Sequence, residues 1–245
     1  MNVEPRIQAK LLDLAALDTE LTRVAHKRKT LPEVEEVQRL ESDRVQHKDA
    51  AVAVEIVLGD LDRDIRKLEG EVDAVRQRGD RDRKMLESGT IAAKALSELQ
   101  HELGSLERRQ GVLEEELLEV MERREATQGD YERAGAQLSE IDDALIDAVR
   151  RRDDALADLA SVEQRHVGDR TALAAELPED LIAAYERQRA QGGVGAALLQ
   201  ARRCGACRIE IDRGQIAQIA ATDPQVVVRC PECNAIMVRT KESGL

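Results

Sequence analysis

Bulky aromatic side chains are almost missing from this 245-residue chain. It contains two tyrosines, Tyr131 and Tyr185, and no tryptophan or phenylalanine. A globular core of this size normally uses several aromatic residues as bulky filler, so the composition argues against one large globular domain. The shortage also removes the ring surfaces on which unpaired nucleotide bases stack, which disfavours recognition of single strands by stacking.

Long apolar runs are missing as well. The most apolar stretch, residues 50–58, is interrupted by Glu55, whereas a membrane span needs about 20 predominantly apolar residues. Residues 1–10 are polar and lack the apolar stretch and the small-residue cleavage site of a signal peptide. These absences predict a cytoplasmic protein without a membrane segment.

The residues that are abundant favour long helices. Charged residues make up 35% of the chain, a share typical of coiled coils when Leu, Ala, Glu and Arg dominate. Apolar residues recur at alternating steps of four and three, which is the seam of a coiled coil, the apolar line along one helix face. The first seam comprises Val54, Leu58, Leu61, Ile65, Leu68, Val72 and Val75, and the second comprises Leu96, Leu99, Leu103, Leu106, Leu113, Leu117 and Val120.

The two seams predict an antiparallel hairpin. If the chain turns back in the polar stretch between them, Val75 faces Leu96, and the same register places Val37 opposite Ala134. We therefore expect a coiled-coil hairpin over residues 1–176, with a tip loop at about residues 79–90 and Thr90 capping the second helix.

This register also predicts a polar girdle midway along the hairpin. Arg44 would lie opposite Thr127, and His47 opposite Arg124. Such a girdle either interrupts the seam to set its register or serves as a hinge or partner site.

Two prolines divide the helical region. Pro32 lies inside the first arm, where proline removes a backbone hydrogen bond and clashes with the preceding turn, so we expect a kink or a helix restart. Pro178 suits the first turn of a new helix. The sequence predicts a linking helix over residues 177–191, followed by a small β-rich module over residues 192–245.

Two Cys-x-x-Cys motifs indicate a metal site in that module. The motifs are Cys204–Cys207 and Cys230–Cys233, separated by 22 residues. Each presents two sulfurs from one tight turn, as tetrahedral Zn²⁺ requires. Four cysteines close the coordination shell without histidine or carboxylate, so we expect one structural zinc. A redox dithiol pair and an iron centre of rubredoxin type are the alternatives.

The sequence around the motifs is typical of a zinc ribbon. Residues 194–200, 226–229 and 235–239 favour strands, and residues 215–221 favour a short helix between the motifs. A module this small cannot bury enough apolar area to fold alone, so metal binding would supply the missing free energy.

Charge is distributed unevenly along the chain. The formal net charge is −12, but residues 187–245 carry nine basic and five acidic side chains. Four thiolates around one Zn²⁺ would lower this local excess from +4 to about +2. The arginines near the cysteine motifs are candidate contacts for a partner protein or a nucleic acid, with ordinary solubility as the alternative: Arg202, Arg203, Arg208, Arg213 and Arg229.

Signatures of catalysis are missing from the sequence. It contains no phosphate-binding loop and no nucleophile elbow. His101-Glu102 begins like a zinc-protease motif, but Ser105 stands where the second histidine would be. We therefore expect a non-enzymatic protein.

Several stretches resemble one bacterial family of coiled-coil hairpin proteins with a C-terminal four-cysteine zinc ribbon. They are Leu96–Gln110 with its continuation over residues 113–122, Tyr185-Glu-Arg-x-Arg189 with Gly192-Gly193, the two cysteine motifs, and residues 235–238. The resemblance implies zinc ligands at the four cysteines. Better-known members are linked to flagellar gene expression and secretion through RNA, a sigma factor or export components. The Ala- and Arg-rich composition is typical of a high-GC bacterium, which need not be flagellated, so the flagellar role is not transferred.

Two functions fit these observations. The first is a cytoplasmic adaptor whose coiled coil docks a partner protein and whose zinc ribbon is a recognition head. The second is a regulatory protein that binds RNA or DNA through the basic ribbon, with strong salt dependence. Apolar residues over 50–58 occupy more than one helix face, which predicts a further contact with a partner protein, another copy or the ribbon, and leaves the oligomeric state open.

Overall fold

The computed structural model describes residues 1–89 and 93–245, which form two compact units. Unit 1 joins Met1–Val34 to Arg151–Leu245, and unit 2 is Glu35–Arg150. Unit 1 therefore holds both chain ends and all four cysteines.

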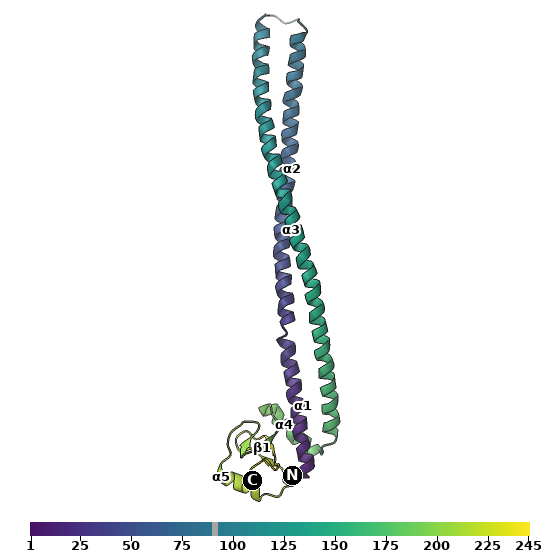
Figure 1. The fold of residues 1–245 in the computed structure, drawn as a ribbon, viewed down its shortest axis with the longest axis vertical. Helices are drawn as coiled ribbons and strands as arrows, with labels where there is room; N and C mark the ends of the chain where they lie inside the picture. Colours follow the sequence, from purple (N-terminus) through teal and green to yellow (C-terminus); the bar gives the residue numbers. More distant parts are fainter. Residues whose placement is uncertain (90–92) are drawn as a thin grey trace. The chain divides into compact units, whose positions relative to one another are not determined.

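Helices dominate both units, and the strands are short and C-terminal (Figure 1). The elements are α1 (Pro5–Lys29), α2 (Pro32–Glu87), α3 (Ala93–Ala175), α4 (Glu179–Gly192), β1 (Ala196–Gln200), β2 (Arg203–Cys204), α5 (Arg213–Ala221), β3 (Val228–Arg229) and β4 (Ile236–Val238). This arrangement confirms the predicted fold class, a long helical hairpin with a small strand-containing zinc ribbon.

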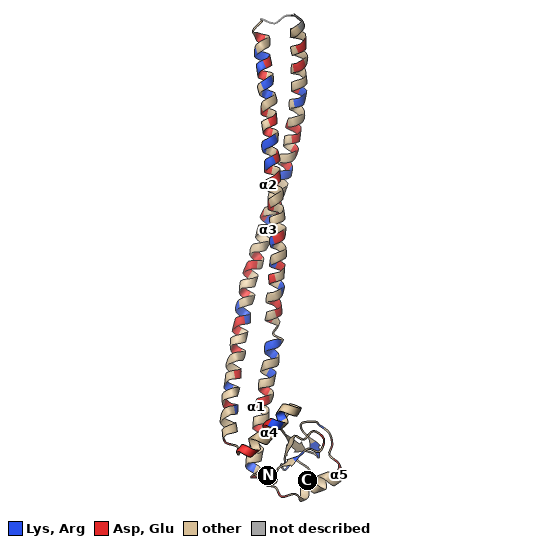
Figure 2. Ribbon diagram, turned by 180° about the vertical axis from the view of Figure 1, so that it is seen from behind, with Lys and Arg blue, Asp and Glu red and all other residues tan. Residues whose placement is uncertain are grey.

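Unit 2 is an antiparallel pair formed by α2 and α3 (Figure 1). Its buried side chains lie at the seam spacing, and charged residues of both signs are distributed along both helices (Figure 2). Long helices gain most of their stability from such a packed face and little from intrinsic propensity. The buried apolar residues of this unit are Val37, Leu40, Leu58, Val72, Leu113, Val120 and Ala148.

The register of the hairpin differs from the prediction. Val37 and Leu40 form a buried cluster with Ala148, and Leu145 packs against it. The predicted register places Val37 opposite Ala134, fourteen positions earlier than Ala148. Fourteen residues are two heptads, and a seam that repeats every seven residues presents the same apolar face after such a shift. Periodicity alone therefore identified the hairpin but not its register.

The tip of the hairpin moves accordingly. The predicted loop at residues 79–90 was wrong in its first part, because α2 continues through Gly79 to Glu87. Gly79 is buried on the seam, one step of four beyond Val75, and it lines a groove with Leu103 and Leu106. A glycine costs a helix interior about 1 kcal/mol relative to alanine, which a long cooperative helix tolerates. Thr90, the predicted cap, lies outside the described residues.

The predicted polar girdle is also wrong in its pairing. Arg44 forms an ion pair with Asp142 at 2.5 Å, and Arg124 pairs with Asp62 at 3.1 Å. Both pairs join α2 to α3 and are partly exposed. In the observed register both arginines therefore pair with carboxylates. The predicted register had placed Arg44 opposite Thr127 and Arg124 opposite His47.

The two prolines act at helix boundaries, as predicted. Helix α1 ends at Lys29 and α2 begins at Pro32, so the first arm restarts there. Pro178 is the N-cap residue of α4, which begins at Glu179. Glu179 and Asp180 place negative charge in the first turn of α4, where it interacts favourably with the positive end of the helix dipole.

Unit 1 packs α1 and α4 against the strands. The sheet has the order β2-β1-β4-β3, in which β1 pairs in parallel with β4 and the other neighbours are antiparallel. The apolar cluster between these elements consists of Val3, Leu11, Leu14, Leu177, Leu181, Ala184, Tyr185, Ala196, Ile236 and Val238. This core includes residues from both ends of the chain.

The N-terminus extends the zinc ribbon. Asn2 forms a β-bridge with Val226, and the amide of Val3 donates to the carbonyl of Gln225 at 2.7 Å. The buried side chain of Gln8 donates to three backbone carbonyls, including those of Val3 and Gln225. The first residues of the chain therefore belong structurally with the predicted ribbon of residues 192–245.

Candidate metal centre and its surroundings

The four cysteines lie in two turns of the same geometry. In the first turn, the amide of Arg208 donates to the carbonyl of Cys204 at 2.8 Å, and the amide of Cys204 donates to Ile209. In the second turn, the amide of Asn234 donates to the carbonyl of Cys230 at 2.9 Å. Each turn, called a knuckle here (residues 204–208 and 230–234), brings its two sulfurs to one side.

The sulfur atoms have the spacing of a zinc site. Sγ of Cys204 lies 3.8 Å from Sγ of Cys233, and Sγ of Cys207 lies 3.9 Å from Sγ of Cys230. All four sulfurs lie within 4.8 Å of one another, and none forms a disulfide. A tetrahedron with Zn–S bonds of about 2.3 Å has edges of about 3.8 Å, so the donor set fits one Zn²⁺ with a closed shell.

Backbone amides are directed at the sulfurs. Hydrogen bonding from the amide of Ile209 lowers the pKa of Cys207. Burial raises the pKa of the Cys204 thiol to about 12, and burial also raises the pKa of Cys233. Zinc binds thiolates, so loading the site must release these protons, and zinc affinity falls as the pH is lowered.

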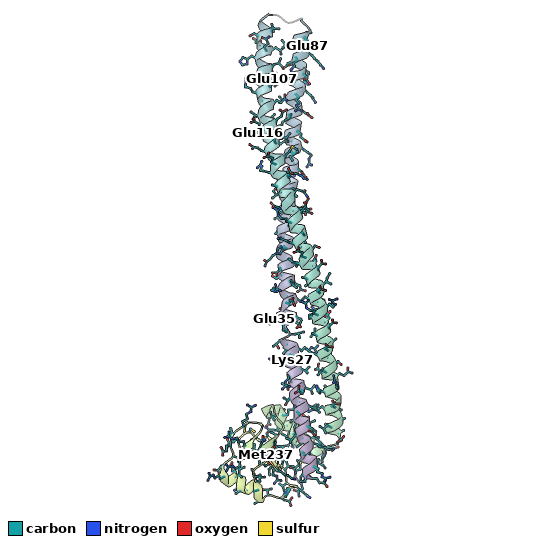
Figure 3. All side chains as sticks on the ribbon, viewed as in Figure 1. Lys27, Glu35, Glu87, Glu107, Glu116 and Met237 are labelled. Carbon is teal, nitrogen blue, oxygen red and sulfur yellow. The ribbon has the colours of Figure 1, made fainter. Side chains whose placement is uncertain are left out.

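A small apolar core surrounds the metal site. Cys204 and Cys230 are buried together with side chains from β1, α5 and β4, whereas Cys207 and Cys233 are half-buried at its edge. Met237 of this cluster is fully buried within the ribbon (Figure 3). The remaining buried members are Leu199, Ile211, Ile216 and Ile219. The metal and this cluster together hold the strands.

The candidate arginines all have exposed side chains, but their surroundings differ. Arg202 and Arg203 share the carboxylate of Glu210, at 4.0 and 3.4 Å. Arg229 donates to the backbone carbonyl of Asn234. Within the described parts of the chain, Arg208 and Arg213 form no ion pair with a carboxylate. A role for these five residues in binding stays a prediction.

One arginine outside that set is structural. The guanidinium of Arg239 donates to five backbone carbonyls, with distances from 2.7 to 3.2 Å. One of these carbonyls, that of Ile219, belongs to the last turn of α5, and the others belong to the segment after it, at Thr222, Asp223, Pro224 and Val226. Burial lowers the pKa of Arg239. From the sequence, Arg239 was recognised only as one of the nine basic residues of 187–245.

Sequence reasoning also missed a buried polar cluster in unit 1. Asp18 of α1 is buried, and its carboxylate accepts hydrogen bonds from Tyr185 Oη and Arg170 Nε, both at 2.6 Å. Arg189 lies 3.1 Å from the same carboxylate, and Glu186 pairs with Arg170. The hydrogen bond to Asp18 raises the pKa of Arg170, and burial raises that of Tyr185.

This cluster explains the motif Tyr185-Glu-Arg-x-Arg189. Both named residues reach Asp18 on α1 and thereby fasten α4 to the first helix of the chain. Gly195 lies against the ring of Tyr185, and a Cβ added there would come within 2.5 Å of a ring carbon. The motif was visible in the sequence, but its partner was not, because Asp18 lies 167 positions from Tyr185.

Family profiles match almost the whole chain. Residues 14–193 match the family described as a CT398-like coiled coil hairpin domain, and residues 203–237 match a C4-type zinc ribbon domain. Neither description is that of an enzyme family. The second match agrees with the sulfur geometry, so the ribbon binds one structural zinc.

Mycobacterial proteins share the full length of the chain. A protein of Mycobacterium tuberculosis is 48% identical over 232 residues, which is 95% of each chain. A protein of Mycobacterium leprae is 42% identical over 228 residues, covering 93% of this chain and 98% of the relative. A solved structure from Mycobacterium smegmatis has 45% identity and a TM-score of 0.86, covering 98% of this chain and 100% of that one.

More distant structures share the fold. CT398 from Chlamydia trachomatis is 14% identical with a TM-score of 0.67, covering 95% of this chain and 97% of its own.

Among the described residues, every helix is too short or too polar to span a membrane.

Proposed function

Because the chain belongs to the family of CT398-like coiled-coil hairpin proteins and carries a C4-type zinc ribbon, we propose that it is a non-enzymatic adaptor of the cytoplasm. In this proposal unit 2 docks a partner protein, and the ribbon is a recognition head held together by zinc. The observation that carries the proposal is the closed shell of four sulfurs. A catalytic zinc keeps a coordination position open for water or substrate, and this site has none to offer.

Exposed apolar side chains on unit 2 support a docking role. On α2, Val45, Val52 and Ile56 are exposed, and on α3 Leu118 is 60% exposed. Single exposed apolar residues are common on soluble proteins, but these recur at spacings of seven and four on α2 and therefore lie on one helix face. Val52 and Ile56 lie in residues 50–58, the stretch for which the sequence predicted a further contact.

Capture from the native cytoplasm by the zinc-loaded chain tests the adaptor proposal. We expect a partner that is retained by the wild type and lost when Val52 and Ile56 are both replaced by Ser. A matched control replaces Asp60 and Asp64, two exposed charged residues of α2 that lie to one side of this face, with Ser as well. Equal capture by all three proteins would contradict docking on this face, and sedimentation of the same samples would show whether the captured partner is a second copy.

Nucleic-acid binding by the ribbon is the second candidate. The arginines around the first knuckle support it, since guanidinium groups bind phosphates in bidentate fashion. Titration with generic RNA and duplex DNA at increasing salt tests it, because phosphate contacts make affinity fall steeply with salt. No binding at low salt would eliminate this candidate.

A further inference from the structure

The two knuckles share one backbone geometry but carry different residues at the position after the second cysteine. Arg208 follows Cys207 with a φ of +63°, and Asn234 follows Cys233 with a φ of +62°. This left-handed region is accessible to asparagine but unfavourable for a long side chain such as arginine. The first knuckle therefore accepts backbone strain that the second knuckle avoids.

A second strained arginine lies beside the first knuckle. Ala201 and Arg202, in the turn between β1 and β2, have φ values of +45° and +65°. Their amides donate to the carbonyls of Glu242 and Ser243, at 3.0 and 3.2 Å, so the C-terminal residues hold the turn in this conformation. Strain of this kind persists where the surrounding structure imposes it, and it clusters at functional sites.

Two of the strained residues, Ala201 and Arg208, border a concave surface. A hollow of about 510 Å³ is lined by Gln200, Ala201, Arg203, Cys204, Gly205 and Arg208. Gly205 lets the first knuckle lie close to β1, because an added Cβ would lie 2.8 Å from the carbonyl oxygen of Leu198. Two of its lining residues, Arg203 and Arg208, carry guanidinium groups, which can bind an anionic group at this surface.

The structure already shows which anion suits this surface. The carboxylate of Glu210 lies 3.4 Å from Arg203 and 4.0 Å from Arg202. Arg208, which also lines the hollow, pairs with no carboxylate among the described residues. Ile209, the next residue, is 48% exposed, so an exposed apolar side chain follows Arg208 in the chain.

These features favour a protein segment over a nucleic acid. Residues 192–245 contain no aromatic side chain on which a base could stack. Zinc thiolates reduce the local charge excess to about +2, a weak attraction for a polyanion. An arginine beside an exposed isoleucine instead matches a segment in which glutamate or aspartate alternates with apolar residues.

We propose that the first knuckle is the recognition site of the head and that it binds an acidic, partly apolar segment of a partner protein. Arg203 and Arg208 would hold one or two carboxylates, and Ile209 would contact an apolar neighbour. The inference rests on the adaptor function proposed above and assigns the chemistry of its partner.

Fluorescence anisotropy with the zinc-loaded full chain tests this site. The probe is a short labelled peptide of glutamates interspersed with leucines, compared with the same peptide carrying glutamine and with labelled polyuridine RNA. The decisive variant is Arg208→Asn, which copies the second knuckle. It relieves strain, so its melting temperature should not fall, whereas its affinity for the glutamate peptide should drop about tenfold through loss of a charge-assisted contact.

Two controls separate this loss from general effects of charge. Arg187→Gln removes one exposed charge from α4 and should bind the peptide like the wild type, while Arg203→Gln should weaken binding like Arg208→Asn. Unchanged binding by Arg208→Asn would overturn the proposal. Binding of RNA but not of peptide would overturn it in favour of the nucleic-acid candidate. If neither probe binds, the acidic-segment site fails, and the adaptor function is still judged separately by capture on unit 2.

Discussion

Unit 2 and unit 1 hold their chains together in different ways. In unit 2 a narrow seam repeats along two helices, and buried residues such as Leu58, Val72 and Leu113 have apolar counterparts seven positions away. In unit 1 the contacts join segments that are far apart in sequence, such as Asp18 with Arg170 and Tyr185. A repeated seam tolerates shifts of whole heptads, whereas a buried carboxylate with specific donors permits one arrangement.

The ion-paired groups of the two units also differ in how far they are exposed to solvent. Arg44 and Asp142 of unit 2 are nearly half exposed, so water competes with their ion pair. Asp18 of unit 1 is 5% exposed, and its partners must satisfy it completely. Loss of one group should therefore cost little in unit 2 and much in unit 1.

The largest effect is expected from the metal site. Replacing Cys230 by serine should abolish stoichiometric zinc and unfold the ribbon, because metal binding contributes about 10 kcal/mol or more to small zinc modules. Zinc analysis and amide NMR spectra measure these changes, and far-UV circular dichroism should retain most of the helical signal. Retention of one zinc per chain would show that Cys230 is not a required ligand. Ser243→Ala, which removes a buried hydroxyl outside the metal site, is the control for general damage.

The buried cluster comes next. Asp18→Ala leaves Arg170 and Arg189 without their shared carboxylate, and breaking a buried ion pair costs about 3 kcal/mol. Tyr185→Phe removes one hydrogen bond to a charged group and should cost about 1.5 kcal/mol or more. Urea unfolding of the zinc-loaded protein measures both. Asp13→Ala, at an exposed position on the same helix, should leave the free energy of unfolding within about 0.5 kcal/mol, and a similar loss in this control would refute the role of Asp18.

A matched pair of leucines on α3 tests the seam of unit 2. Leu113 is 1% exposed and Leu118 is 60% exposed. Leu113→Ala should destabilise unit 2 by about 2 kcal/mol or more, whereas Leu118→Ala should change stability by less than about 0.5 kcal/mol. Thermal unfolding followed at the helical band measures the difference, and equal effects would contradict the assigned helix face.

The smallest effect tests the register. A double-mutant cycle with Arg44→Ala and Asp142→Ala should give a coupling energy of about 0.2–1 kcal/mol for an exposed pair. The corresponding cycle with Arg44→Ala and Thr127→Ala, which the alternative register would bring together, should give no coupling. Coupling in the second cycle alone would restore that register. Chemical denaturation at low salt offers the best sensitivity, because salt screens such pairs.

The four ligating residues could be identified from the sequence because they depend on local geometry. Each Cys-x-x-Cys turn brings two sulfurs together within four residues. Only the approach of the two turns to each other depends on the tertiary structure. The buried cluster could not be identified in the same way, since nothing near Asp18 distinguishes it from the many exposed acids of the helices. Its partners approach only after the chain has folded back.

Sequence by itself determined the elements of this protein: two long helices, their antiparallel pairing, the helix restart at Pro32 and the zinc ribbon. These follow from periodicity, proline sterics and cysteine spacing, which act over a few turns. The register of the hairpin, the place of the N-terminus on the ribbon and the strained backbone at Arg202 and Arg208 depend on the folded structure. Heptads cannot distinguish shifts of seven residues, and backbone strain is imposed by contacts with distant segments.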